Sequence, residues 1–152
     1  MRSIELLEAG HVNFKTIHLG ESVRTARDVA DAYNCDIAQV LKTLVFICDN
    51  SPLIAIIQGD SKVDTRKLSR LFGKNSIRMA SAEEVFSITS YAVGSVSPLG
   101  LPKSIDKIMD GNILNLQTVL IGSGEEKIII QLDSSSLQQA WNGRIGDITK
   151  NL

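Results

Sequence analysis

The sequence contains few of the side chains that enzymes most often use for nucleophilic or metal-assisted catalysis. Among 152 residues there are two histidines, His11 and His18, both near the N-terminus. A Ser-His-Asp or Cys-His arrangement would need one of them, and no motif around either points that way. Walker loops, the Rossmann glycine pattern and the HExxH motif are also absent. We therefore expect no metal ion, no cofactor and no nucleotide hydrolysis.

Cysteines and long apolar runs are also scarce. Cys35 and Cys48 do not form a CxxC pair, so we expect them to be small buried hydrophobic residues. Every apolar run is far shorter than the roughly 20 residues of a membrane-spanning helix. The first residues include acids and no cleavage site, which argues against a signal peptide. We expect a cytoplasmic protein that does not enter a membrane.

The composition is that of a folded domain: 43% of the residues are hydrophobic and 22% are charged. The length fits one domain over residues 1–152. Because the net charge is −1, a nucleic-acid partner would have to be bound by a local basic patch rather than by the field of the whole chain.

Helical and strand patterns are mixed along the chain. Capping boxes begin helices at Thr25, Asp36 and Ser81. Helices are predicted at 1–9, 25–34, 36–41, 62–72, 81–88 and after 133, and strands at 12–19, 42–48, 53–57, 77–79, 105–109, 118–121, 127–132 and 145–148. Residues 42–48 and 53–57 are apolar on both faces and should lie in the middle of a covered sheet. The pattern predicts an α+β fold with a central mixed, partly barrel-like sheet flanked by helices.

One stretch, residues 91–100, has more chain breakers than a simple turn requires. Gly94 allows a positive φ or a close approach of the backbone. Pro98 fixes its own φ and restrains Ser97. The result is a stiff loop that could present backbone N–H groups at a fixed angle, although such punctuation is also typical of a structural turn.

Two basic features accompany this loop. Lys42 lies between Leu41 and an apolar strand, so its ammonium either reaches an edge of the sheet or lies at the rim of a polar pocket. Lys62, Arg66 and Arg70 recur every four residues on one face of the predicted helix 62–72. This face is either simply solvated or a contact for a phosphate backbone.

The segments 39–46 (QVLKTLVF) and 91–100 (YAVGSVSPLG) together resemble the YbaK/EbsC family. These are aminoacyl-tRNA deacylases related to the editing domain of bacterial prolyl-tRNA synthetases. The resemblance extends from about Thr25 to Trp141 and includes the helix start at 63–68 and the Gly122-Ser123-Gly124 corner.

The resemblance implies a trans-editing hydrolase that deacylates mischarged tRNA, namely tRNA-Pro carrying Cys, Ala or another small amino acid. Water, or a thiol or ribose hydroxyl of the substrate, would attack the ester. It implies catalytic roles for Lys42, Gly94 and Pro98, with no metal ion. The substrate would also contact Thr43, Ser95, Val96, Ser97, Gly122, Ser123 and Gly124, and tRNA would contact Lys62, Arg66 and Arg70.

Two points stay open at the level of the sequence. Family members often carry a serine where this chain has Gly122, with Ser123 one position on, so the amino acid that is removed is not determined. The chain could also be a binding module without turnover, associated with tRNA or with a prolyl-tRNA synthetase, or a degenerate structural domain.

Overall fold

The computed structural model describes residues 2–20, 23 and 25–151. The strands in this part of the chain form two sheets. The α-helices are α1 (Arg2–Ala9), α2 (Ala26–Tyr33), α3 (Thr65–Phe72), α4 (Ala82–Thr89) and α5 (Ser134–Ala140), and the 3₁₀-helices are η1 (Ile37–Gln39) and η2 (Gly111–Asn115). The strands are β1 (Lys15–His18), β2 (Leu41–Cys48), β3 (Ser51–Gln58), β4 (Ile77–Met79), β5 (Asp106–Asp110), β6 (Thr118–Gly122), β7 (Ile128–Asp133) and β8 (Arg144–Gly146). None of the described helices has the length and apolar character needed to cross a membrane.

The larger sheet has the order β4-β2-β3-β5-β8 and is mixed, as predicted. Strands β2, β3 and β4 pair antiparallel, whereas β5 and β8 join in parallel. A tight turn connects β2 to β3, and both of its residues, Asp49 and Asn50, have positive φ. The central position of β3 and its run of five buried residues confirm the prediction of a covered middle strand.

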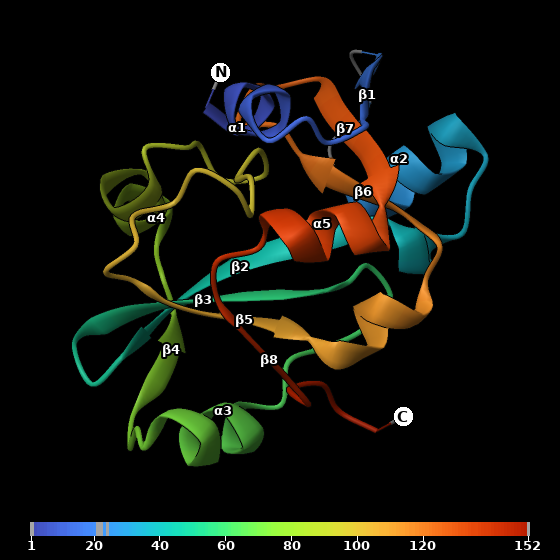
Figure 1. Cartoon of the computed structure of the whole chain (residues 1–152). Coiled ribbons are helices and arrows are strands. Elements are labelled where there is room, and N and C mark those ends of the chain that lie inside the picture. Colours follow the sequence, from blue (N-terminus) through green and yellow to red (C-terminus); the bar gives the residue numbers. More distant parts are fainter. Residues whose placement is uncertain (1, 21–22, 24, 152) are drawn as a thin grey trace.

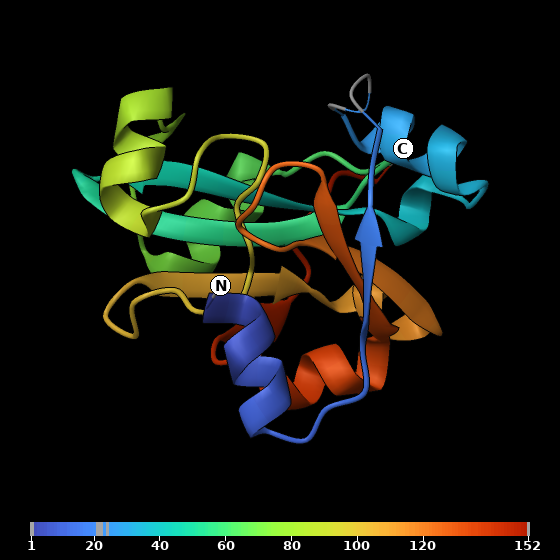
Figure 2. The same ribbon diagram turned by 90° about the horizontal axis from the view of Figure 1, so that it is seen from above.

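The smaller sheet, β1-β7-β6, is antiparallel and lies over one face of the larger one (Figure 1). The main core fills the space between the two sheets and includes Ile54, Ile56 and Met109. Helix α3 covers the opposite face of the larger sheet, where it buries Leu68 against Phe46. The view from above shows α2 and α4 at opposite ends of the molecule (Figure 2). The predicted mixed fold is therefore confirmed, but the strands are divided between two sheets that do not close into a barrel.

Several element boundaries differ from the predicted ones for local reasons. The predicted helix 36–41 is only one 3₁₀ turn, η1, because Val40 leaves it to bridge Leu120 of the smaller sheet. Helix α3 begins at Thr65 rather than at residue 62, because the Asp64 side chain accepts hydrogen bonds from the first backbone N–H groups. The alternating pattern of residues 105–109 predicts a half-exposed strand, but β5 is almost fully buried, since β8 pairs with its second edge.

Strand β2 belongs to the larger sheet, and the smaller sheet approaches one of its edges only where the strand begins. Val40, just before β2, bridges Leu120 of β6. Farther along, the Ala80 N–H donates to the Val45 carbonyl, and β4 pairs with β2 only from Phe46 onward. Between these two contacts, no strand of the described residues lies beside the edge of β2. The candidate functional site lies at this gap.

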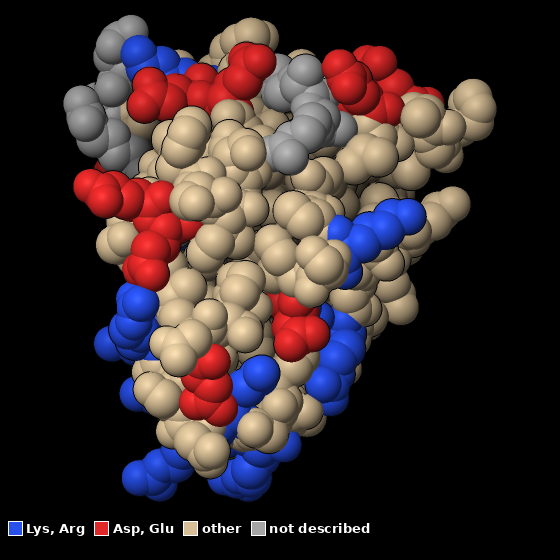
Figure 3. Space-filling view, turned by 90° about the vertical axis from the view of Figure 1, so that its left-hand side faces the viewer, with Lys and Arg blue, Asp and Glu red and all other residues tan. Residues whose placement is uncertain are grey.

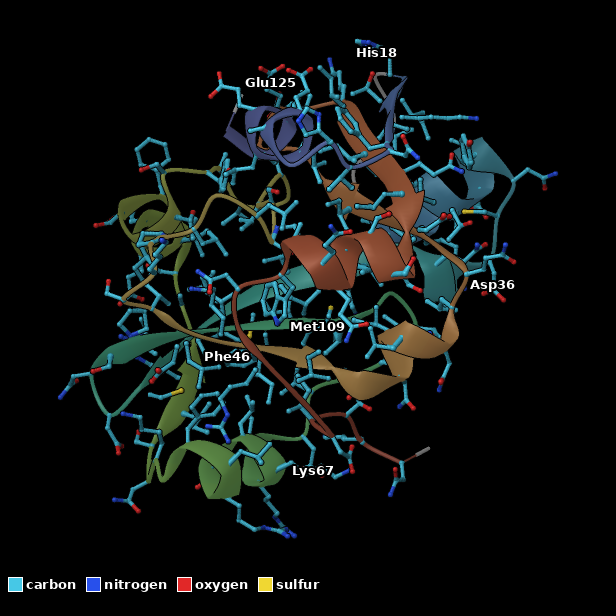
Figure 4. All side chains as sticks on the ribbon, viewed as in Figure 1. His18, Asp36, Phe46, Lys67, Met109 and Glu125 are labelled. Carbon is cyan, nitrogen blue, oxygen red and sulfur yellow. The ribbon has the colours of Figure 1, made fainter. Side chains whose placement is uncertain are left out.

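The C-terminal tail forms hydrogen bonds with the segment that precedes α3. The Asp64 N–H donates to the Ile148 carbonyl, and the Lys67 ammonium contacts both Asp147 and the Thr149 carbonyl. Figure 4 shows Lys67 between α3 and this tail. On the other side, the buried Asp110 carboxylate accepts from the Ile148 N–H at 3.1 Å. The tail is thus held between β5 and the start of α3.

We expect Asp110→Ala to lower the free energy of unfolding by about 3 kcal/mol, because it leaves the N–H of the buried Ile148 without an acceptor and removes the N-cap hydrogen bond from Asn112. The matched control is Asp133→Ala, since Asp133 occupies the same N-cap position before α5 but makes no side-chain capping bond. Urea unfolding followed by circular dichroism measures both. Equal losses in the two variants would contradict this account of Asp110.

Candidate functional site

A cavity of about 610 Å³ lies at the gap in the edge of β2. One wall is the backbone of residues 41–45, and another is the loop 93–96, which reaches the cavity from the far side of the gap. The start of α2, the corner at Gly122 and the turn 125–129 complete it. Aliphatic side chains dominate the wall on the loop side: Leu41, Val45, Val85, Val93 and Val96. The cavity therefore combines an apolar wall with exposed backbone.

Hydrogen bonds within the loop 91–100 fix its conformation. The Tyr91 hydroxyl donates to the Leu99 carbonyl, and the Ser97 hydroxyl accepts from the Leu99 N–H. Gly94 has φ +88°, a conformation that residues with a side chain rarely adopt. Pro98 is buried and does not line the cavity. The stiffness predicted from the sequence is present, and Pro98 belongs to the support of the loop rather than to its exposed side.

The glycine corner after β6 provides the surface on which the loop rests. A Cβ on Gly122 would lie 2.6 Å from the Val96 carbonyl oxygen, and a Cβ on Gly124 would lie 2.2 Å from the Tyr91 ring. The Gly124 N–H also donates to the Ser95 carbonyl. Two backbones can approach this closely only because these positions lack side chains. The glycines therefore set the distance between the loop and β6.

Lys42 also lines the cavity, but its side chain lies on the face of β2 opposite that of Leu41 and Val45. Side chains alternate along a strand, so Lys42 shares a face with Leu44 and Phe46, which pack toward α3. Its ammonium donates to the Ser61 carbonyl at 3.0 Å. Burial lowers the pKa of Lys42, an effect that the nearby Asp60 carboxylate opposes and the Lys62 ammonium reinforces. The cation is held at the edge of the sheet and does not sit against the Gly94 loop.

The structure brings together six of the residues predicted for the site and leaves four others out of the cavity lining. Those that line it are Lys42, Thr43, Gly94, Ser95, Val96 and Gly122, and those that do not are Ser97, Pro98, Ser123 and Gly124. Ser123 is fully buried, and its hydroxyl donates to the Ile128 carbonyl. Although Ser123 follows Gly122 directly, its side chain does not reach the cavity, because neighbouring side chains of an extended segment point in opposite directions.

The sequence did not single out the acidic part of the lining. Glu125 and Glu126 lie in the turn between β6 and β7, at the top of the molecule in Figure 4, where Glu125 is labelled. Acids in such a turn are usually just solvated, so no local signal distinguishes them. Thr25 is a second example: it was predicted as a helix cap, which it is, and it also lines the cavity.

The predicted tRNA-binding face forms a separate hollow on α3. Arg66 and Arg70 line it together with Thr65, Ser69, Asn75 and Ile77. Lys62 is exposed but lies outside the hollow, before the helix begins. Basic side chains gather at this lower end of the face shown in Figure 3, whereas acidic ones are more frequent toward its top. A chain of nearly zero net charge therefore carries a local basic region.

Comparison with known proteins agrees with this geometry. The model of the aminoacyl-tRNA editing domain matches residues 20–140, which include the cavity lining except Leu19 and all strands except β1 and β8. The chain belongs to this family. The resemblance inferred from residues 39–46 and 91–100 is confirmed.

Relatives include both isolated domains and long synthetases. The chain is 31% identical over 103 residues to the proline–tRNA ligase of Streptococcus mutans, but it spans only 17% of that protein's length. It is 23% identical over 150 residues to EbsC of Enterococcus faecalis, a candidate Cys-tRNA(Pro)/Cys-tRNA(Cys) deacylase, and spans 92% of it. A crystal structure of a candidate trans-editing enzyme for prolyl-tRNA synthetase superposes with a TM-score of 0.87 at 27% identity, covering 99% of this chain and 96% of the other.

The surroundings of Lys42 predict how its pKa responds to nearby charges. We expect a value below the usual lysine pKa of about 10.4. Asp60→Asn should lower the pKa further, because it removes a negative charge, and Lys62→Met should raise it, because it removes a positive one.

The Lys42 ¹³Cε chemical shift followed against pH measures these changes. Asp31→Asn, an exposed acid on α2, is the control and should leave the Lys42 pKa unchanged. A Lys42 pKa above the usual value, or a response to Asp31→Asn as large as that to Asp60→Asn, would contradict the placement of this ammonium.

Proposed function

We propose that the chain is a deacylase that hydrolyses the ester between a wrongly attached amino acid and the 3′ end of a tRNA. The observation that carries the proposal is the cavity between the edge of β2 and the rigid loop at Gly94, in a chain that belongs to the editing-domain family. The apolar wall suits the side chain of an uncharged amino acid. Cysteine attached to tRNA-Pro or tRNA-Cys is the substrate that the name of the Enterococcus faecalis relative favours.

The backbone of the loop supplies the chemistry. Within the described part of the chain, the N–H groups of Gly94 and Val96 make no hydrogen bond, and both residues line the cavity. Attack on the ester carbon by water, or by a hydroxyl or thiol of the substrate, places negative charge on the carbonyl oxygen. Fixed N–H donors stabilise that charge by a few kcal/mol each. The bond to the ribose oxygen then breaks, and this oxygen takes up the proton lost by the nucleophile.

Lys42 and the basic hollow belong to the recognition of tRNA in this proposal. The Lys42 ammonium donates to Ser61 and keeps further N–H groups for a phosphate or hydroxyl of the terminal nucleotide. It lies on the face of the sheet that α3 covers, near Lys62. The tRNA backbone would follow the basic side chains of α3 and cross the edge of β2 at Lys42. The ester would then enter the cavity from that edge toward Gly94.

We expect Lys42→Met to lower kcat/KM for a mischarged tRNA by roughly 10- to 100-fold, because a hydrogen bond from a charged group is lost. The measurement is single-turnover deacylation with a panel of tRNAs carrying different amino acids. Lys103→Met, which removes an exposed lysine before β5, is the control.

Two results would count against the proposal in different ways. If the wild type deacylates no member of the panel but binds the tRNA, the chain is a binding module without turnover. If Lys42→Met and the wild type are equally active, the role of Lys42 is wrong.

Salt dependence tests the hollow on α3. Replacing Arg66 and Arg70 by Gln should reduce the slope of log Kobs against log salt concentration by about 1 to 2, since each lost phosphate contact removes about 0.7 to 0.9. The double variant Lys15→Gln, Lys103→Gln removes the same charge elsewhere on the surface. Filter binding between about 50 and 200 mM salt covers the useful range. Identical slopes for both double variants would place the tRNA away from α3.

A further inference from the structure

The gap in the edge of β2 leaves backbone groups directed at the cavity. Because the Val45 carbonyl accepts from Ala80, the N–H and C=O groups of Val45 point to the side of β4 and away from β3. These directions repeat every second residue along a strand. The N–H and C=O of Thr43 therefore point to the same side, at the position where neither β6 nor β4 is paired with β2.

Thr43 lies in the middle of this gap. The bridge from Val40 to Leu120 precedes it, and the bond from Ala80 to Val45 follows it. No loop or turn within residues 2–20, 23 and 25–151 supplies a backbone partner to Thr43. Thr43 also lines the cavity. Its two main-chain groups are therefore available to a ligand, and leaving them unpaired in a closed site would be costly.

We propose that the aminoacyl group pairs with Thr43 as a single residue of an added strand, an inference that rests on the proposed function. The α-ammonium donates to the Thr43 carbonyl, and the ester carbonyl accepts from the Thr43 N–H. In an antiparallel sheet, two opposed residues exchange both hydrogen bonds in this way. An aminoacyl ester carries its donor and its acceptor on the same Cα, as a residue of a strand does. Loop N–H groups at Gly94 or Val96 contact the same oxygen from across the gap.

The pairing contacts the α-ammonium and the carbonyl that α-amino acid esters share. It also distinguishes L- from D-aminoacyl groups. In a hydrogen-bonded antiparallel pair, the two side chains project from the same face. The Thr43 side chain lies on the face of Leu41 and Val45, because side chains alternate. An L-aminoacyl side chain would thus enter the apolar wall formed with Val85 and Val96. A D-aminoacyl side chain would point toward Lys42 instead.

A change of one backbone atom tests the subsite. Incorporating the α-hydroxy acid analogue of threonine at position 43 replaces its N–H by oxygen and keeps the side chain. We expect kcat/KM for L-aminoacyl-tRNA to fall roughly 10- to 100-fold. The same analogue at Thr16, an exposed position of β1 outside the cavity lining, is the control and should stay within about threefold of the wild type. Urea unfolding of each variant checks that it is folded.

A second measurement uses the unaltered chain and does not depend on turnover. The probe is 3′-deoxy-3′-(L-alanylamino)adenosine, which resists hydrolysis, added to ¹⁵N-labelled protein. The Thr43 amide signal should move with the L-alanyl probe, and binding should weaken at least about 10-fold with the D-alanyl probe or with one that lacks the amino group.

The outcomes separate the two proposals. If the ester-linked variant keeps full activity, or if the Thr43 amide does not respond while the L and D probes bind equally, the subsite is wrong and the deacylase proposal stands. If no aminoacyl-tRNA is hydrolysed but the Thr43 amide responds to the L probe alone, the subsite stands and the deacylase proposal fails.

Discussion

Strand β2 pairs along its whole length with β3 but shares its other edge between two different strands. β6 approaches it at Val40 and β4 at Val45, and neither reaches the residues between them. The separation of the two sheets begins at this point, and the cavity fills the space that results. Unpaired backbone next to an apolar wall is unfavourable unless water or a ligand satisfies it. The geometry of one strand edge thus places both the cavity and the main-chain groups of Thr43 beside it.

The opposite wall depends on two contacts that tolerate no side chain. Gly122 lies against the Val96 carbonyl, and Gly124 lies against the Tyr91 ring. Together with the hydrogen bond from Tyr91 to Leu99, they hold the loop at a fixed distance from β6. A loop fixed before the substrate arrives loses little conformational freedom on binding. The proposed deacylation would depend on such preorganisation, because donors that stabilise a developing charge act best when they are already aimed at it.

Charge is divided between the two faces of β2. In the proposed reaction the apolar loop side would accommodate the amino acid, whereas the α3 side carries Lys42 and the basic residues of the helix. Burial lowers the pKa of Lys42, whereas the nearby Asp60 carboxylate raises it. The Ser61 carbonyl accepts a hydrogen bond from the ammonium. The tail between Asp110 and α3 keeps the segment 61–64 in place. A substrate that combines a small acyl group with a phosphate chain fits this division.

The sequence alone determined the features that depend on neighbours within three or four residues. The capping boxes at Thr25, Asp36 and Ser81 were predictable, as was the stiff loop at Gly94, because each rests on local hydrogen bonds or backbone restrictions. Six of the residues predicted from the sequence line the cavity. Most of these six were predicted from the family resemblance rather than from the spacing of residues. Only the tertiary structure decided the rest.

The separation into two open sheets, the burial of Ser123 and Pro98, and the free edge at Thr43 depend on which strand pairs where. That choice is made by contacts between segments far apart in the chain, and the apolar patterns of these strands fit several partners equally well.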